Sequence, residues 1–350
     1  MSPSGRPREG RQGPSPVLGE PRARFWREGG PTRALAGLAL LLATSFAGAQ
    51  TPFSFAVFGD TPYHPLEVPA IKQLLLDIDR AGMAFVVNIG DLKRATEECS
   101  NDVFRERHAL LDASPRPLVF TPGDNEWTDC HSKAAGEYDP RERLDALRVL
   151  FFANDESLGR TKLRVARQSD DPRFRPYREN ARWIAGGIVF ATFNVPGSNN
   201  NLMQGPAKDD ESARRASRGF AEHAARMTAN FAWLAEGVEL ARQPAMRGLA
   251  IFAHADPLFD NQPGSSDGYE AWRQALRLQA AALGKPMLLV HGDGHRYRVD
   301  QPLTDPVTFD RLANFTRVEV FGSPTVGWVR VDVAPESERV FAISPGRPTP

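Results

Sequence analysis

Short apolar runs that stop at an aspartate or a histidine are the feature that most constrains this chain. Each run has the length of a buried strand, and a Gly-Asp pair or a histidine follows it directly or, after Leu118–Thr121, one residue later. The runs are Phe53–Phe58, Ala84–Ile89, Leu118–Thr121, Leu249–Ala253 and Met287–Val290. Helical patterns alternate with them, which predicts an α/β fold whose parallel strands are covered by helices. Ligands of such sheets bind beyond the carboxyl ends of the strands, so we expect the chemistry at these stops.

The remaining patterns extend this fold without dividing it. They predict helices at Val68–Arg80, Asn101–Ala113, Ser212–Ala241 and Ala271–Leu283, and further strands at Ile188–Asn194, Val318–Phe321 and Val326–Val333. Gly159–Arg182 and Gly264–Gly268 are polar and predict loops, and Asn194–Asn200 is interpreted as a polar turn. No internal repeat or linker interrupts the chain after residue 49, so residues 50–350 are expected to form a single domain.

The N-terminal region has the pattern of an export signal. Residues 1–33 are rich in Pro, Gly and Arg, and an uncharged apolar run follows, which ends in Ala47-Gly48-Ala49. A basic region, a short apolar region and small residues at the end predict a signal peptide over residues 1–49, here with a long basic extension. The run is shorter than the ~20 apolar residues of a membrane span. We therefore expect a secreted or periplasmic protein without a transmembrane anchor after cleavage, although a translation start downstream of Met1 stays an alternative.

Charge and cysteine content limit the possible partners. Basic and acidic residues are equal in number, 43 each, so no basic field indicates a nucleic-acid partner, and a small-molecule substrate is expected instead. The oligomeric state stays open. In an oxidising compartment the two cysteines, Cys99 and Cys130, can form one disulfide. Each follows a Gly-Asp turn at the same end of the predicted sheet, and this placement favours the pairing.

The residues at the strand ends are of the types that bind metal ions. They are Asp60, Asp91, Asp124, His254, Asp293 and His295. Glycine precedes each of these aspartates, and a glycine lets the chain turn sharply and approach an ion closely. Carboxylate and imidazole ligands from several strand ends can enclose two divalent cations ~3.5–4 Å apart, as in dinuclear hydrolases. Because no cysteine belongs to the set, a structural zinc site is disfavoured.

The order of these motifs resembles that of the calcineurin-like metallophosphoesterase family, which includes the purple acid phosphatases. The family pattern is D-x-H, then GD, then GNH[D/E], then a lone histidine, then GHxH, and the resemblance covers residue 53 to about residue 297. It implies a sandwich of two mixed β-sheets flanked by helices. It also implies two divalent metal ions and hydrolysis of a phosphomonoester or phosphodiester by a metal-bridging hydroxide.

The resemblance assigns roles to the matching positions. Asp60 matches a ligand of the first metal, Asp91 matches the carboxylate that bridges both metals, and His254 matches a ligand of the second metal. His295 keeps the second histidine of the last motif. The histidine of the first motif falls on Pro62, which has no ligand atom in its side chain. Either Tyr63 or His64 is expected to take its place.

The third motif is altered at its catalytic position. Aligned without gaps, Asp124 takes the place of the asparagine ligand and Asn125 that of the catalytic histidine. A shifted register would keep Asn125 as the ligand, but the ungapped register is favoured because a carboxylate preserves an oxygen donor. Since an asparagine cannot act as an acid, proton donation to the leaving group is expected from another residue. His64 and His131 are the candidates, because histidine titrates near neutral pH.

The last motif is altered as well. Asp293 replaces its first histidine, and His291 just before it is interpreted as a metal ligand or as a partner of one. The extra carboxylates favour Mn, Fe, Mg or Ca over Zn without excluding Zn. The altered motifs also support an alternative function, a catalytically weak or inactive protein that binds metal or phosphate on the same fold. A hydrolase of a different ester is a third possibility.

Overall fold

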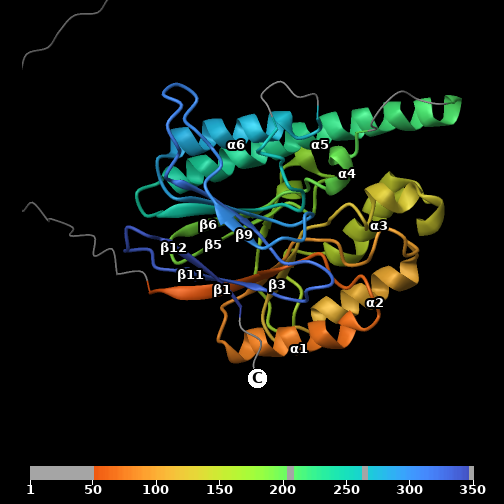
Figure 1. Ribbon diagram of the computed structural model, residues 1–350, viewed down its shortest axis with the longest axis horizontal. Helices are drawn as coiled ribbons and strands as arrows, with labels where there is room; N and C mark the ends of the chain where they lie inside the picture. The colour runs from red at the N-terminus through yellow and green to blue at the C-terminus, as the bar shows by residue number, and fades with distance from the viewer. Residues whose placement is uncertain (1–50, 203–208, 262–266, 347–350) are drawn as a thin grey trace, which may run out of the picture. The chain divides into compact units, whose positions relative to one another are not determined.

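The computed structural model describes residues 51–202, 209–261 and 267–346. Within these residues two β-sheets pack face to face and helices cover their outer faces (Figure 1). The first sheet has the order β12 (Phe341–Pro345), β11 (Val329–Val333), β1 (Phe53–Phe58), β2 (Val86–Asn88) and β3 (Leu118–Phe120). The second has the order β4 (Ala166–Arg167), β5 (Ala181–Ala185), β6 (Ile188–Thr192), β7 (Gly248–Phe252), β8 (Met287–His291), β10 (Phe315–Glu319) and β9 (Arg298–Asp300). Both sheets are mixed, as the resemblance implied.

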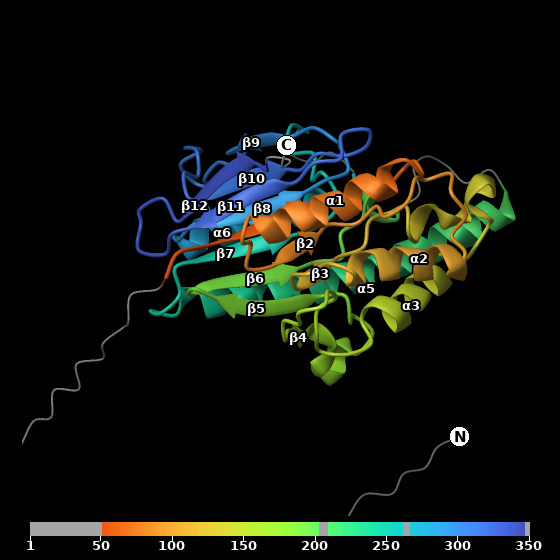
Figure 2. The same cartoon turned by 90° about the horizontal axis from the view of Figure 1, so that it is seen from below.

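The helices divide between the two outer faces. α1 (Glu67–Arg80), α2 (Asn101–Asp112) and α3 (Pro140–Phe151) lie on the side of the first sheet, as Figure 2 shows. α5 (Asp210–Arg242) and α6 (Glu270–Leu283) lie on the second sheet, and the short α4 (Gly197–Asn200) follows β6. None of the described helices is long and apolar enough to cross a membrane.

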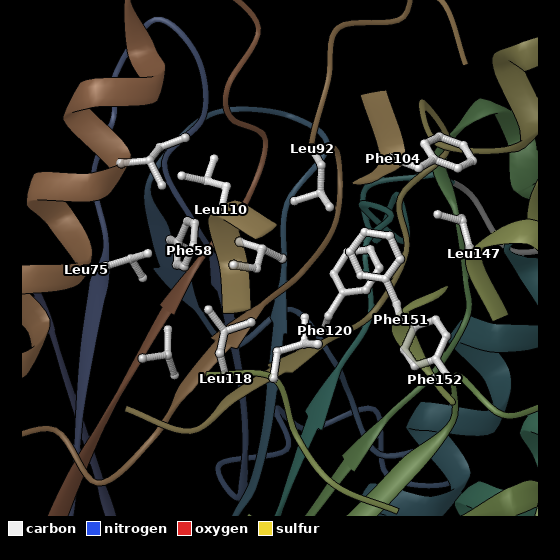
Figure 3. Close-up of a cluster of buried hydrophobic side chains, with 14 of the residues drawn as sticks. Phe58, Leu75, Leu92, Phe104, Leu110, Leu118, Phe120, Leu147, Phe151 and Phe152 are labelled. Atoms are coloured by element: carbon white, nitrogen blue, oxygen red, sulfur yellow. The ribbon is translucent and has the colours of Figure 1, made fainter. Parts of the chain in front are cut away.

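Three apolar layers hold these elements together. Phe55, Val57, Phe190 and Phe252 are fully buried between the two sheets, which explains the continuous apolar runs of the parallel strands. A second layer lies beneath α1, α2 and α3, and Figure 3 shows part of it, with residues such as Phe58, Phe104 and Leu147. A third layer fills the space beneath α5 and α6. Removing any of these large buried side chains would leave a cavity and cost about 3–5 kcal/mol for an aromatic residue.

The expected elements agree with this fold to within a few residues, with some omissions. β1 has the predicted bounds, and α1, α2, α5 and α6 begin and end within two residues of theirs. The helix α3 was not expected, although Asp139 caps its first turn by accepting from the Arg141 backbone N–H at 2.9 Å. The predicted loop 159–182 contains β4 and the start of β5. The predicted signal peptide and most of the predicted loop 264–268 lie outside the described residues.

Candidate metal centre

The carboxyl ends of parallel strands from both sheets meet at one edge of the sandwich. β1, β2 and β3 are parallel to one another, and so are β6, β7 and β8. As a result the predicted ligands form two groups whose ligand atoms lie within 4.8 Å of one another. The first group is Asp60, Asp91 and His254, and the second is Asp124, His254 and Asp293. The site therefore lies between the sheets, with carboxylates from both.

The backbone at this edge explains why glycines accompany the ligands. Asp60, Asp91, Asp293 and His295 all have positive φ values, between 54° and 71°, which non-glycine residues adopt at an energetic cost. A Cβ atom on Gly123 would lie 2.1 Å from Asp91 Oδ1, and one on Gly292 would lie 2.1 Å from Asp60 Oδ2. Any side chain at these glycines would displace a carboxylate. The Gly-Asp turns therefore let neighbouring strands bring their ligands into contact.

His254 lies at the centre of the two groups. Its Nε2 is 3.0 Å from Asp124 Oδ1, 3.4 Å from Asp91 Oδ1 and 3.8 Å from Asp293 Oδ1. Its Nδ1 donates to the backbone carbonyl of Ile89 at 2.9 Å, which orients the ring. A ligand histidine whose other nitrogen is bound by a carbonyl is a common arrangement in metal sites.

His295 is oriented by a backbone carbonyl in the same way as His254. Its Nε2 is 3.6 Å from Asp60 Oδ1, and its Nδ1 donates to the Ser323 carbonyl at 2.9 Å. The Asp293 backbone N–H donates to Asp60 Oδ1 at 2.9 Å, so the β1 and β8 turns are also joined directly. The remaining oxygen of Asp60, Oδ2, is buried without a hydrogen-bond partner among the described residues. A cation would satisfy that oxygen.

The electrostatics of the site favour binding of cations. Burial raises the pKa of Asp60 and of Asp293 to about 7, and neighbouring carboxylates add to the effect. Burial also raises the pKa of Asp91 well above its usual value. The pKa of His254 is raised well above its usual value because Asp91, Asp124 and Asp60 outweigh the opposing effect of burial. The site thus holds more negative charge than it can keep ionised, and its donor set fits divalent metal ions.

Tyr63 and Asn125 complete the surroundings of Asp91. The Tyr63 hydroxyl donates to Asp91 Oδ2, and the Asn125 amide Nδ2 donates to the same oxygen at 2.6 Å and to the Tyr63 hydroxyl at 3.0 Å. The Asn125 backbone N–H donates to Asp91 Oδ1 at 3.1 Å. His64, by contrast, is exposed, and its Nδ1 accepts from the Leu66 backbone N–H. Of the two alternatives for the missing histidine, only Tyr63 faces the site.

The third motif lies in the ungapped arrangement. The Asp124 carboxylate belongs to the second ligand group, whereas the Asn125 amide contacts Asp91 and Tyr63 instead. Burial raises the pKa of Asp124, but the hydrogen bond and charge of His254 outweigh it and lower the pKa below its usual value. Asp124 is therefore an ionised oxygen donor at the position where the family has an amide.

Solved structures share this fold, although no protein-family model and no curated protein matches the sequence. A dimetal phosphatase from Danio rerio is 13% identical, and the match covers 85% of this chain and 100% of that chain with a TM-score of 0.50. A purple acid phosphatase from yellow lupin seeds is 17% identical over 81% of this chain and 50% of that chain, with a TM-score of 0.47. PhoD is 13% identical over 85% of this chain and 69% of that chain, with a TM-score of 0.49. This chain has the calcineurin-like metallophosphoesterase fold.

Within this metallophosphoesterase fold, one predicted site residue, His291, lies on the face of the second sheet that is turned away from the metal centre. His291 follows Leu289 by two residues in β8, and Leu289 packs in the layer beneath α5 and α6, so His291 points away from the space between the sheets. Burial lowers the pKa of His291 to about 4, and its charged neighbours are Asp256, Arg317 and Arg298. The prediction that His291 is a metal ligand is therefore wrong. Side chains alternate between the two faces of a strand, and the turn after β8 brings Asp293, but not His291, to the face that borders the first sheet.

A cleft of about 690 Å³ is lined by Ser198, whose hydroxyl contacts Asp124, but by none of the ligand residues themselves. His131 lines it together with Asp129 and Ser198, and the His131 Nδ1 donates to the Thr128 carbonyl at 2.7 Å. Of the two histidines expected to donate a proton, His131 is the one that lines this cleft. A larger cleft of about 1260 Å³ lies between α2, α3 and α5, but it contains none of the predicted site residues.

The loop after β6 also reaches the site, contrary to its interpretation as a plain polar turn. Ser198 Oγ lies 2.9 Å from Asp124 Oδ2 and 2.6 Å from Asp129 Oδ1. A Cβ on Gly197 would lie 2.7 Å from oxygens of both Asp124 and Asp293. Residues 198–201 all have positive φ, between 47° and 66°, so the turn is left-handed and strained. Four consecutive Ser and Asn residues after a strand were the available signal, because Asn tolerates this conformation.

The predicted disulfide is confirmed. Cys99 and Cys130 are bonded, with their Cα atoms 5.7 Å apart and both side chains fully buried. The two sulfurs lie 3.5 and 3.6 Å from the backbone carbonyl oxygen of Asn125. The buried carboxylate of Glu126 joins the same two loops, since it accepts from the backbone N–H groups of Leu92 and Gly123. The loops after β2 and β3 are thus tied to each other directly behind the site.

Proposed function

We propose that this protein is a dinuclear metal-dependent phosphoesterase that hydrolyses a small-molecule phosphomonoester or phosphodiester. The observation that carries this proposal is the convergence of two Asp/His groups from both sheets on one buried, electronegative site. The metallophosphoesterase fold supports it as well. Fold alone would be a weak argument, because one fold hosts many functions.

The geometry suggests how the ligands divide between the cations. Asp60, Tyr63 and His295 would hold the first cation. Asp124, His254 and Asp293 would hold the second, and Asp91, which contacts residues of both groups, would bridge the two. This set is richer in oxygen than in nitrogen, which favours Mn, Fe or Mg over Zn.

The protein residues around the site have complementary tasks in this proposal. When bound, the two cations would activate a water molecule and stabilise the charge of the phosphoryl oxygens. Asn125 keeps Asp91 and Tyr63 in place through its amide hydrogens but cannot donate a proton to a leaving group. His131 lines the cleft next to the second group and would donate that proton when its ring is charged.

Metal analysis combined with a chromogenic phosphodiester assay tests this function. Purified protein should contain about two equivalents of metal, and turnover of bis-p-nitrophenyl phosphate should fall about a thousandfold or more in Asp91→Ala, because this change removes a ligand of both cations. An Arg173→Ala variant is a suitable control, because Arg173 is exposed and forms its ion pair with Asp171, which is not one of the site residues. Turnover that survives Asp91→Ala unchanged would contradict the proposal.

One observation favours a second candidate function, that of a metal- or phosphate-binding protein without significant catalysis. The residue in the place of the family's acid histidine, Asn125, is fully engaged with Asp91 and Tyr63. Two equivalents of tightly bound metal and measurable phosphate binding, without p-nitrophenol release, would support this second function. Cleavage of another class of ester, with no phosphate released from any phosphoester, would indicate the third possibility, a hydrolase of a different ester.

We also propose that the protein is exported, after cleavage of residues 1–49. The Cys99–Cys130 disulfide supports this, because stable disulfides are typical of oxidising compartments. N-terminal sequencing of the protein from the extracellular or periplasmic fraction tests it. The expected N-terminus is Gln50, and an intact chain confined to the cytoplasm would contradict the proposal.

A further inference from the structure

Glu67 joins two loops beside the first ligand group. It lies in the first turn of α1 and is only 9% exposed. Its Oε2 accepts from the Thr61 hydroxyl at 3.0 Å and from the Tyr63 backbone N–H at 2.7 Å. Its Oε1 accepts from the Ser323 hydroxyl at 2.6 Å, although Ser323 is 256 residues away in the sequence.

The two loops that Glu67 joins position the side chains of Tyr63 and His295 near Asp60. The first loop presents the Tyr63 hydroxyl to Asp91. In the second loop, the Ser323 carbonyl accepts from His295 Nδ1 at 2.9 Å, and the Ser323 backbone N–H donates to the Asp60 carbonyl at 2.8 Å. One carboxylate thus holds Tyr63 directly and, through Ser323, the ring of His295, and the two rings contact each other with their centroids 5.1 Å apart.

The two oxygens of Glu67 accept from all three partners. A side chain without polar atoms at this position would make none of these hydrogen bonds. A glutamine is a weaker test, because its NH₂ could donate to the Ser323 hydroxyl while its oxygen accepts from the Tyr63 N–H.

We infer that Glu67 is a positioning residue for the first cation: it touches no ligand atom itself but holds Tyr63 and His295 where they can bind. This inference rests on the proposed function, which assigns those two residues to the first cation. The second ligand group has separate supports, because His254 is held by the Ile89 carbonyl and Asp124 contacts Ser198. The effect of Glu67 is therefore selective for one of the two cations.

Helix α1 does not depend on Glu67 for its place in the fold. Ile71 and Ile78 on the same helix are fully buried in the layer beneath it, with Leu74 and Leu75 beside them. Fully burying such side chains contributes about 1.5–3 kcal/mol each. A substitution at Glu67 should therefore disturb the two loops and leave the helix packed.

Calorimetric titration of metal-depleted protein with Mn²⁺ tests the inference, and it needs no phosphoester substrate. In an Asp293→Ala background, which lacks a ligand of the second cation, Glu67→Ala should weaken Mn²⁺ binding by about tenfold or more, the usual effect of losing a partner of a metal ligand. In a His295→Ala background, which lacks a ligand of the first cation, Glu67→Ala should change the Kd by less than about twofold. Glu67→Asp keeps the charge and should recover part of the affinity.

Asp77→Asn is the matched control for a purely structural role. Asp77 is an acidic residue of the same helix, 4% exposed, and it accepts from Gln73 and Arg80 away from the site. This control should lower Tm without changing either Kd. Ser323→Ala is a second variant, since it removes one donor and leaves Glu67 intact, and it should weaken only the first-cation Kd, by a few fold.

The outcomes separate the inference from the function on which it rests. If neither the native protein nor either of the two single-site backgrounds binds Mn²⁺, the proposed dinuclear function is wrong. If the native protein binds two Mn²⁺ ions while Glu67→Ala and Ser323→Ala change both sites equally, or change neither, the positioning role of Glu67 is overturned. Circular dichroism of each variant confirms that the fold is retained.

Discussion

The two ligand groups differ in what encloses them. The Asp60 side chain is completely buried, and the hydrogen bond between Glu67 and Ser323 joins two loops beside it. The Asp293 side chain is 32% exposed, and its group contacts the strained turn of Ser198, which also lines a cleft. The first group thus resembles the interior of the protein, and the second resembles a binding surface.

Because of this difference, we expect the two proposed cations to have different roles. An ion held by ligands that are themselves fixed by buried hydrogen bonds exchanges slowly and binds tightly. An ion beside an open cleft is accessible to a phosphoryl group and to the residues that line the cleft, such as His131. We therefore expect the first cation to bind more tightly, and the second to determine contact with substrate.

The largest expected effect comes from His254, whose ring lies within reach of both groups. His254→Ala should remove the second cation and reduce phosphodiester turnover about a thousandfold, because three carboxylates then lose their shared partner. Metal content per chain measured by mass spectrometry should fall from two equivalents to one. If both equivalents are lost together, the two groups are not independent and the comparison between them fails.

The pH dependence of the metal-free protein is the next largest effect. The pKa of Asp60 and of Asp293 is about 7 in the folded protein against an ordinary value of 3.8, so between about pH 4 and 7 the folded state binds more protons than the unfolded chain. Stability from these groups therefore falls as pH rises through this range and stays low above pH 7. The raised pKa of His254 acts in the same direction, since its contribution is lost as pH rises through the folded value.

Thermal unfolding of metal-depleted protein should consequently show a lower Tm at pH 8 than at pH 5. Metal binding displaces these protons, so Mn²⁺ affinity should increase at least about tenfold between pH 6 and pH 8. Calorimetry at both pH values, in buffers of different ionisation enthalpy, would count the released protons. A Tm that rises with pH in the absence of metal would show that the buried carboxylates are not the dominant groups.

Removal of the disulfide should affect both groups. Cys99→Ala with Cys130→Ala deletes the bond behind Asn125 and should destabilise the fold by about 2–4 kcal/mol, as measured by urea unfolding of the oxidised and variant proteins. Glu126 still joins the same loops, so the protein should remain folded. Mn²⁺ affinity should fall several fold at both sites, because Asn125 holds Asp91 and Tyr63 and Asp124 lies next to Asn125 on the same loop. A loss confined to one site would show that the disulfide supports only one of the two groups.

The smallest effect is expected from Ser198→Ala. This change removes a hydroxyl that lies 2.9 Å from Asp124 Oδ2 and leaves the Gly197 backbone in contact with the site. An exposed hydrogen bond of this kind is worth about 0.5–1.5 kcal/mol, which corresponds to a few fold in Mn²⁺ affinity at the second site. The first-site Kd should not change, and an effect there would mean that the strained turn supports both groups.

Local patterns in the chain were sufficient for the strand ends and for most of the fold. The apolar run Phe53–Phe58 matches β1, and Asp60, Asp91 and Asp124 do follow parallel strands, because a glycine turn after an apolar run is a local signal. The cysteine pairing was also predictable, since both residues follow such turns. The helix α3 was missed although its cap residue Asp139 and first-turn proline are visible in the sequence.

The surroundings of the ligands depend on contacts between distant parts of the chain, which no local pattern encodes. His291 and Asp293 are two residues apart, yet they lie on opposite sides of the second sheet, and only the packing of that sheet against the first shows which side is the site. Tyr63 and His64 are neighbours, and only the position of Asp91 selects Tyr63. The partnership of Glu67 with Ser323 arises because folding brings two loops, 256 residues apart, to one buried carboxylate.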